Sequence, residues 1–138
     1  RECGSEPTEQ RRIYMKYMFA SDVHGSAYYC RKMLETYKKE QAERLVLLGD
    51  LLYHGPRNDL PKEYAPKEVI KMLNGMKQEI YAVRGNCEAE VDQMVLEFPV
   101  MADYCILAID GLTFYATHGH VYNENNLPPF CPGDILIH

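Results

Sequence analysis

The sequence lacks several features that define large classes of protein. It has no tryptophan, and no apolar run comes near the ~20 residues of a membrane-spanning helix, so we expect no membrane association. Its cysteines form no CxxC pair and have no regular spacing, which is typical of reduced thiols in the cytoplasm rather than of a disulfide framework. The net charge of -5 leaves no broad basic surface, so stable nucleic-acid binding is not expected.

What remains is the composition of an ordinary globular domain. The 138 residues are 46% hydrophobic and 25% charged, with no biased tract and no internal repeat, and their number suits one domain. Residues 1–14 differ from the rest because they are polar, begin without methionine and contain neither an apolar segment nor a signal-peptide cleavage site. We interpret residues 1–14 as a disordered leader or a spurious extension, and residues 15–138 as the domain.

Short apolar runs alternate with helical patterns up to about residue 100. Apolar runs at 15–20, 45–48 and 80–83 predict buried strands. Helices are expected after Ser26, which can cap one, from Pro66 to Gly75, and over residues 88–98. Strands that alternate with helices predict a parallel sheet with right-handed crossovers.

The pattern changes in the last third of the sequence. Apolar runs at 104–109 and 112–117 are joined by Asp110-Gly111, which is a strong signal for a two-residue hairpin. A further apolar run at 135–137 predicts another strand. A second sheet, antiparallel or mixed, should therefore begin after residue 100.

Polar clusters follow the apolar runs at the point where each run ends. They comprise residues 21–25 (SDVHG), 49–50 (GD), 85–88 (GNCE) and 118–120 (HGH). Ligands of open α/β sheets bind outside the carboxyl ends of the strands, so these clusters are expected to converge at one edge. Their aspartate, asparagine and histidine side chains offer mixed oxygen and nitrogen ligands that suit Mn²⁺, Fe²⁺ or Zn²⁺.

Each cluster also has a simpler interpretation. Asp22 could cap the following helix, and Gly49-Asp50 could be an ordinary turn at a strand end. Asn86 after a glycine could be a turn residue in a left-handed conformation. His118 and His120 could be a pair of surface histidines. The ordered set of four clusters, rather than any one of them, favours a metal site.

That ordered set resembles the motif series of the calcineurin-like metallophosphoesterase superfamily. The series here reads Asp22-x-His24, Gly49-Asp50 with Gly55, the GNCE run at 85–88, and His118-Gly119-His120. The stretches FASDVHGS, LLGDLLYHGPRN, AVRGNCEAEVDQM and THGH are similar to the YfcE-type phosphodiesterase branch. The resemblance implies an α/β fold, a four-layer α/β/β/α sandwich, with most of the first sheet and the start of the second present.

The resemblance also implies two divalent metal ions, most simply Mn²⁺, with Fe²⁺ or Zn²⁺ as alternatives. Asp22 and His24 would bind the first ion, Asp50 would bridge both, and Asn86 and His118 would bind the second. A water between the ions would become a hydroxide that attacks the phosphorus of a phosphate ester. The implied activity is that of a divalent-metal-dependent phosphodiesterase.

Further roles follow from the same resemblance and from side-chain chemistry. Asn86 and His120 would stabilise charge on the phosphate oxygens and contact the substrate. Arg57 suits phosphate binding because of its guanidinium fork, although an exposed loop arginine is the alternative. Many relatives carry histidine as a proton donor where this chain has Cys87, and a thiol is a poor substitute, so Cys87 is more simply a small apolar filler.

The family's last motif, Gly-His-x-His, supplies one histidine to each metal. The sequence stops at the run that resembles the strand before this motif, so we expect a chain that is incomplete at its C-terminus, with three protein ligands left for each ion. Besides the enzyme, two other readings stay open: a non-catalytic Vps29-like protein-binding scaffold and an inactive hydrolase fragment. A small phosphate ester is the expected partner, in the cytoplasm, with homo-oligomerisation open.

Overall fold

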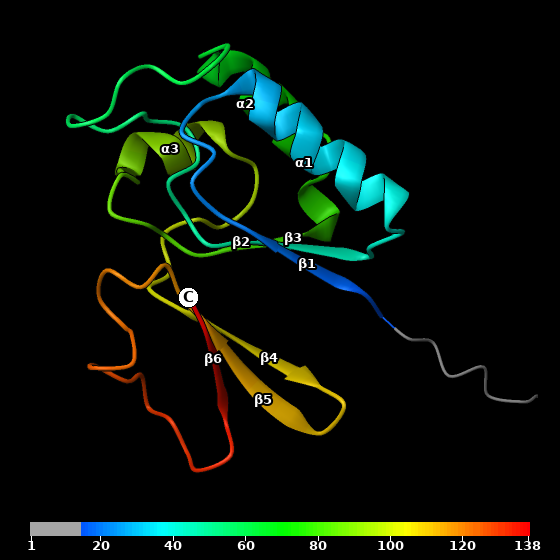
Figure 1. The fold of residues 1–138 in the computed structure, drawn as a ribbon, viewed down its shortest axis with the longest axis vertical. Helices are drawn as coiled ribbons and strands as arrows, with labels where there is room; N and C mark the ends of the chain where they lie inside the picture. Colours follow the sequence, from blue (N-terminus) through cyan, green and yellow to red (C-terminus); the bar gives the residue numbers. More distant parts are fainter. Residues whose placement is uncertain (1–14) are drawn as a thin grey trace, which may run out of the picture.

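A three-stranded parallel sheet forms the N-terminal half of the fold. The computed structural model describes residues 15–138, so the interpretation of residues 1–14 lies outside the described part. Strands β1 (Tyr17–Ala20), β2 (Arg44–Leu47) and β3 (Ile80–Ala82) lie in the order β1-β2-β3 and pair in parallel (Figure 1). The three predicted strands and their parallel arrangement are therefore confirmed.

Three helices cover one face of this sheet. They are α1 (Ala27–Lys39), α2 (Pro66–Asn74) and α3 (Glu90–Val95), with a short 3-10 turn, η1, at Lys77–Glu79. The Ser26 hydroxyl accepts the N–H of Tyr29 and so caps α1, as predicted. Pro66 occupies the first turn of α2, and Gly75 follows its last residue, which confirms both predicted limits.

The third helix is shorter than the expected range of 88–98. Leu96 has extended backbone angles (φ -92°, ψ 131°), so the last helical residue is Val95. At the other end, Glu88 lies before the helix, and its carboxylate binds backbone N–H groups of other loops. Local apolar spacing could not reveal that this acidic residue had long-range partners.

The second sheet follows and is mixed. Strands β4 (Cys105–Ile109), β5 (Leu112–Ala116) and β6 (Ile135–Ile137) lie in the order β4-β5-β6. The β4–β5 pair is antiparallel, and β5–β6 is parallel. Asp110 (φ 50°) and Gly111 (φ 76°) both adopt the left-handed conformation that a tight hairpin turn needs, which confirms the hairpin prediction.

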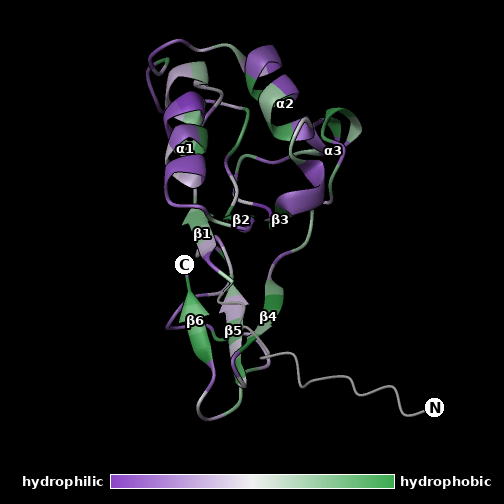
Figure 2. Ribbon diagram, turned by 90° about the vertical axis from the view of Figure 1, so that its right-hand side faces the viewer, coloured by the Kyte–Doolittle hydropathy of each residue, from purple (hydrophilic) through white to green (hydrophobic). Residues whose placement is uncertain are grey.

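The core has two parts because residues of the first sheet alternate between its faces. Leu45 and Leu47 pack with the helices, whereas Val46 and Leu48 pack against Leu107 and other residues of the second sheet. The result is a stack of helices, first sheet and second sheet (Figures 1 and 2). These layers are the part of the sandwich that the sequence was expected to contain, and within residues 15–138 no helix covers the outer face of the second sheet.

Among the helices of residues 15–138, none has the length and apolar character that crossing a bilayer requires.

Candidate metal centre

Two glycines bring the loops after β2 and β3 into direct contact. A Cβ atom on Gly85 would lie 2.2 Å from Asp50 Oδ1, and one on Gly49 would lie 2.2 Å from the Gly85 nitrogen. Gly49 also has φ 101°, which side-chain-bearing residues rarely adopt. Only glycine at both positions lets the two strand ends approach this closely.

Three of the expected metal ligands have left-handed backbone conformations. Asp22, His24 and Asp50 have φ values of 60°, 50° and 56°. Backbone hydrogen bonds connect the two loops that carry them. The Asp22 N–H donates to the carbonyl oxygen of Gly49 (3.0 Å), and the His24 N–H donates to the carbonyl oxygen of Asp50 (2.9 Å). Such strained conformations cluster at functional sites, where the surrounding structure holds them in place.

His24 presents one ring nitrogen to two carboxylates. Its Nδ1 lies 2.8 Å from the carbonyl oxygen of Tyr53, which can only accept, so this nitrogen carries the proton. Nε2 is left with a free lone pair, 3.1 Å from Asp22 Oδ1 and 3.7 Å from Asp50 Oδ2. The ring is therefore oriented with its acceptor nitrogen toward acceptor oxygens.

His118 repeats this arrangement from the second sheet. Its Nδ1 lies 2.7 Å from the carbonyl oxygen of Leu48, so the proton again lies away from the carboxylate. Nε2 lies 2.9 Å from Asn86 Oδ1 and 3.5 Å from Asp50 Oδ2. A histidine that donates one nitrogen to a backbone carbonyl while its other lone pair stays free is typical of a metal ligand.

With both rings neutral, the lone pairs of His24 Nε2 and His118 Nε2 therefore face the same carboxylate. Asp50 is 3% exposed; its Oδ1 accepts the N–H of Cys87 at 2.9 Å, while Oδ2 faces both histidines. Lone pairs and carboxylate charges at these distances repel each other unless a cation or a proton lies between them. The donor set therefore fits divalent metal ions.

The distances also define which side chains could share an ion. Ligand atoms of Asp22, Asp50 and His118 lie within 4.8 Å of one another, as do those of His24, Asp50 and Cys87. The first group combines Asp22 with His118, which the family motifs would assign to different ions. Asp50 belongs to both groups. The assignment of each side chain to one ion stays a prediction.

Cys87 has a protonated thiol in this environment. Burial, followed by the negative charge of Asp50, raises the pKa of Cys87 to about 11. Because the thiol holds its proton this tightly, it would donate poorly to a leaving group at neutral pH.

A cavity of about 510 Å³ opens over these residues. Its wall consists of Asp22, His24, Asp50, Tyr53, Gly55, Pro56, Arg57, Asn58, Asn86 and Cys87. Arg57 is exposed in this wall, and no carboxylate lies within 4.0 Å of its guanidinium among residues 15–138. It is therefore a free cation beside the acceptor cluster.

His120, a predicted substrate contact, and Arg84 lie at the margin of the site. His120 is outside the cavity wall and packs edge-on against His118, with ring centroids 5.2 Å apart. Burial, and then the proximity of His118, lowers the pKa of His120. Arg84 pairs with Asp103 at 2.6 Å, so it orients a carboxylate outside the cavity.

The sequence did not predict the role of one residue of the site, Glu88. Glu88 accepts backbone N–H groups from Asp50 (2.9 Å), Leu51 (2.8 Å) and Gly85 (2.5 Å). Its place in the Gly85–Glu88 cluster was visible in the sequence, but nothing there indicated partners 37 and 38 residues away.

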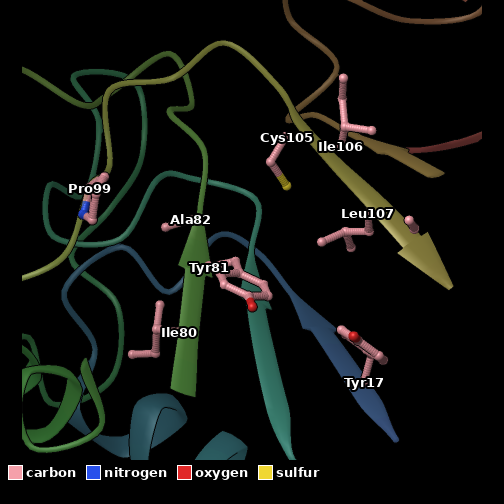
Figure 3. A pocket seen from close by; sticks show the side chains of 9 residues that line it. Tyr17, Ile80, Tyr81, Ala82, Pro99, Cys105, Ile106 and Leu107 are labelled. Carbon is pink, nitrogen blue, oxygen red and sulfur yellow. The ribbon is translucent and has the colours of Figure 1, made fainter. Parts of the chain in front are cut away.

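A second hollow lies elsewhere, between the edges of β3 and β4. This groove of about 470 Å³ is lined by Tyr17, Ile80, Tyr81, Ala82, Pro99, Cys105, Ile106, Leu107 and Ala108 (Figure 3). Its walls are mostly apolar, and Cys105 is the single metal-ligating side chain among them. The polar cavity around Asp50 is therefore the candidate functional site.

The sequence of residues 15–129 matches the calcineurin-like phosphoesterase superfamily domain. The chain belongs to this superfamily. It is 45% identical over 124 residues to phosphodiesterase YfcE of Escherichia coli, covering 90% of this chain and 67% of that protein. It is also 27% identical over 112 residues to a phosphodiesterase of Methanocaldococcus jannaschii, covering 77% of this chain and 60% of that protein.

Solved structures give the same result. The structure of the YfcE phosphoesterase from E. coli superimposes with a TM-score of 0.83 at 46% identity, covering 87% of this chain and 66% of that one. An archaeal phosphodiesterase matches with a TM-score of 0.55 at 27% identity, covering 77% and 60%. The α/β fold is thus that of a phosphoesterase family of hydrolases, and the chain spans about two thirds of the length of its relatives.

Proposed function

We propose that this chain is a divalent-metal-dependent phosphodiesterase whose reaction centre lies around Asp50. The observation that carries the proposal is the shared oxygen Asp50 Oδ2, which faces the lone pairs of His24 Nε2 (3.7 Å) and His118 Nε2 (3.5 Å). One carboxylate between two histidines suits two neighbouring dications, because its charge reduces their mutual repulsion.

The proposed ligands divide into two sets that share Asp50. Asp22, His24 and Asp50 hold the first ion, and Asp50, Asn86 and His118 hold the second. Mn²⁺ is the proposed metal, because carboxylate and amide oxygens with imidazole nitrogens suit it; Fe²⁺ and Zn²⁺ are the alternatives. When bound, the ions polarise the phosphoryl group and lower the pKa of the attacking water.

The remaining side chains act on the substrate. Arg57 binds the phosphate from the cavity wall, where its guanidinium is free of carboxylate partners. The Asn86 side chain, whose Oδ1 lies 2.9 Å from His118 Nε2, lines the same cavity and contacts the phosphate oxygens. His120, whose lowered pKa favours the neutral ring, lies next to His118 and completes the phosphate contacts.

The proposed substrate is a small phosphodiester rather than a nucleic-acid duplex, since the cavity holds about 510 Å³ and the chain carries a net charge of -5. The free thiols of Cys30, Cys87, Cys105 and Cys131 support a reducing, cytoplasmic location. The same proposal has no need of a membrane or of a second protein.

The test compares metal-free and Mn²⁺-loaded protein on bis(p-nitrophenyl) phosphate, with Mn²⁺ binding followed by electron paramagnetic resonance. We expect hydrolysis only with metal, and its loss in Asp50→Asn but not in Asp59→Asn, an exposed loop aspartate used as control. Metal-independent hydrolysis, or no Mn²⁺ binding at all, would overturn the proposal. Binding of Mn²⁺ without hydrolysis would favour the scaffold interpretation.

A further inference from the structure

The carboxylate of Glu88 connects the two loops that carry Asp50 and Asn86. Its Oε2 accepts the N–H groups of Asp50 (2.9 Å) and Gly85 (2.5 Å), and its Oε1 accepts that of Leu51 (2.8 Å). Asp50 and Leu51 follow β2, whereas Gly85 follows β3. One side chain therefore satisfies three donors from two separate strand ends.

These donors need a partner from outside their own loop. Gly49 (φ 101°) and Asp50 (φ 56°) are consecutive left-handed residues, so the chain leaves the regular pairing of β2 at this point. Successive N–H groups in such a turn converge on one anion. In residues 15–138 that anion is the Glu88 carboxylate, and buried N–H groups left without it would be costly.

The contacts reach the candidate metal ligands directly. The Asp50 backbone is held by Glu88, and the Asp50 side chain accepts the N–H of Cys87, the residue before Glu88, at 2.9 Å. Asn86 lies between Gly85, also held by Glu88, and Cys87. The position of the Asp50 carboxylate relative to the Asn86 amide is thereby fixed from both sides.

We propose that Glu88 is the positioning residue of the metal centre, which sets the Asp50–Asn86 spacing without touching an ion or the substrate. The inference rests on the proposed function, because it assumes that Asp50 and Asn86 bind metal. A carboxylate is required rather than any residue of this shape. The three donors need two oxygens, and an amide would turn one N–H₂ group toward a backbone N–H.

Glu88→Gln tests this, with Asp92→Asn as the matched control. Asp92 is a buried carboxylate only four residues further on, and its Oδ2 accepts the Ala89 N–H at 2.7 Å. It therefore stabilises the start of α3 but accepts none of the N–H groups of Asp50, Leu51 and Gly85. Both substitutions replace a carboxylate that accepts backbone N–H groups in the same region, so comparing them separates a positioning effect from a general loosening of the loop.

Two readouts are measured on both variants and on the wild type. Mn²⁺ affinity, from the free-ion paramagnetic resonance signal, should weaken about 10- to 100-fold in Glu88→Gln and stay near the wild-type value in Asp92→Asn. Amide hydrogen exchange of the metal-free protein gives the second readout. Exchange at Asp50, Leu51 and Gly85 should accelerate in Glu88→Gln alone.

The outcomes separate the two proposals. Wild-type metal affinity and unchanged exchange in Glu88→Gln would overturn the positioning role while leaving the metal-dependent function intact. Equal losses in both variants would also overturn it, because they would show a general effect of loosening α3. If the wild type bound no Mn²⁺, the proposed function would fail, and accelerated exchange at the three amides would still report whether Glu88 fixes the loops.

Discussion

His118 Nε2 lies 3.5 Å from Asp50 Oδ2, while the other ring nitrogen of this histidine lies 2.7 Å from a backbone carbonyl. The carbonyl fixes one proton on Nδ1, so the neutral ring turns the lone pair of Nε2 toward the carboxylate oxygen. This pairing of two acceptors, just beyond the end of β5, is unfavourable unless a cation or a proton lies between them. Metal binding should therefore stabilise the fold.

The first prediction concerns the unshared ligands. His118→Ala should remove one Mn²⁺ and leave the other, because Asp22, His24 and Asp50 remain in place. Hydrolysis should fall about 100-fold or more, since charge stabilisation by one ion is lost. Metal stoichiometry by equilibrium dialysis checks this. A variant that retains two ions would place His118 outside the metal site.

Arg57 provides a prediction about substrate binding. Because its guanidinium lies in the cavity wall without a carboxylate partner, Arg57→Ala should raise KM about 10-fold through loss of a charge-assisted phosphate contact. Arg57→Lys should recover part of that loss, and Mn²⁺ stoichiometry should not change in either variant. Unchanged steady-state kinetics in Arg57→Ala would show that this arginine is only an exposed loop residue.

A third prediction tests the contact between the loops. Gly85→Ala would place a Cβ atom 2.2 Å from Asp50 Oδ1, so the loops must separate and the metal site must open. We expect a loss of about 1–3 kcal/mol in the free energy of unfolding, measured by urea denaturation, together with weaker Mn²⁺ binding.

Gly75→Ala is the control for that substitution. Gly75 has a helical φ of -62°, and the nearest atom to an added Cβ lies at 3.4 Å, so alanine fits there. It should leave stability and metal binding close to those of the wild type. Equal behaviour of the two variants would contradict the tight approach of Gly85 to Asp50.

Cys87 gives the fourth prediction. Its thiol holds its proton, with a pKa of about 11, so it supplies no efficient proton donor at neutral pH. Cys87→Ala should therefore keep most of the activity on an ester with a good leaving group, rather than lose the roughly 100-fold or more that a general acid contributes. A loss of that size in the kcat of the variant would assign Cys87 a catalytic role.

Much of this site could be predicted because its residues follow strands directly. Asp22, Asp50 and Asn86 each lie just beyond a strand of the first sheet, and parallel strands bring their carboxyl ends to one edge. The hairpin at Asp110-Gly111 was predictable for a similar reason, since left-handed turns favour these residues. In both cases a short stretch of sequence determined the local geometry.

Other features depended on contacts between distant segments. The proton on each histidine is fixed by the carbonyls of Tyr53 and Leu48, which the sequence does not mark as acceptors. Glu88 resembled an ordinary first-turn helix residue, and its three N–H partners appear only once two loops meet. The early end of α3 also involves a distant segment, because the Asn74 side chain donates to the Val95 carbonyl and accepts the Glu97 N–H.

The most direct test of the account is a Mn²⁺ titration of the wild type and of Asp50→Ala. Asp50 faces both histidines through one oxygen. Its loss should therefore lower the affinity for both ions at once, and by more than any other single ligand substitution. We expect two Mn²⁺ per wild-type chain and no tightly bound Mn²⁺ in Asp50→Ala, with the fold retained by circular dichroism. Retention of two ions by the variant with wild-type affinity would contradict the bridging role of Asp50 and, with it, the proposed dinuclear centre.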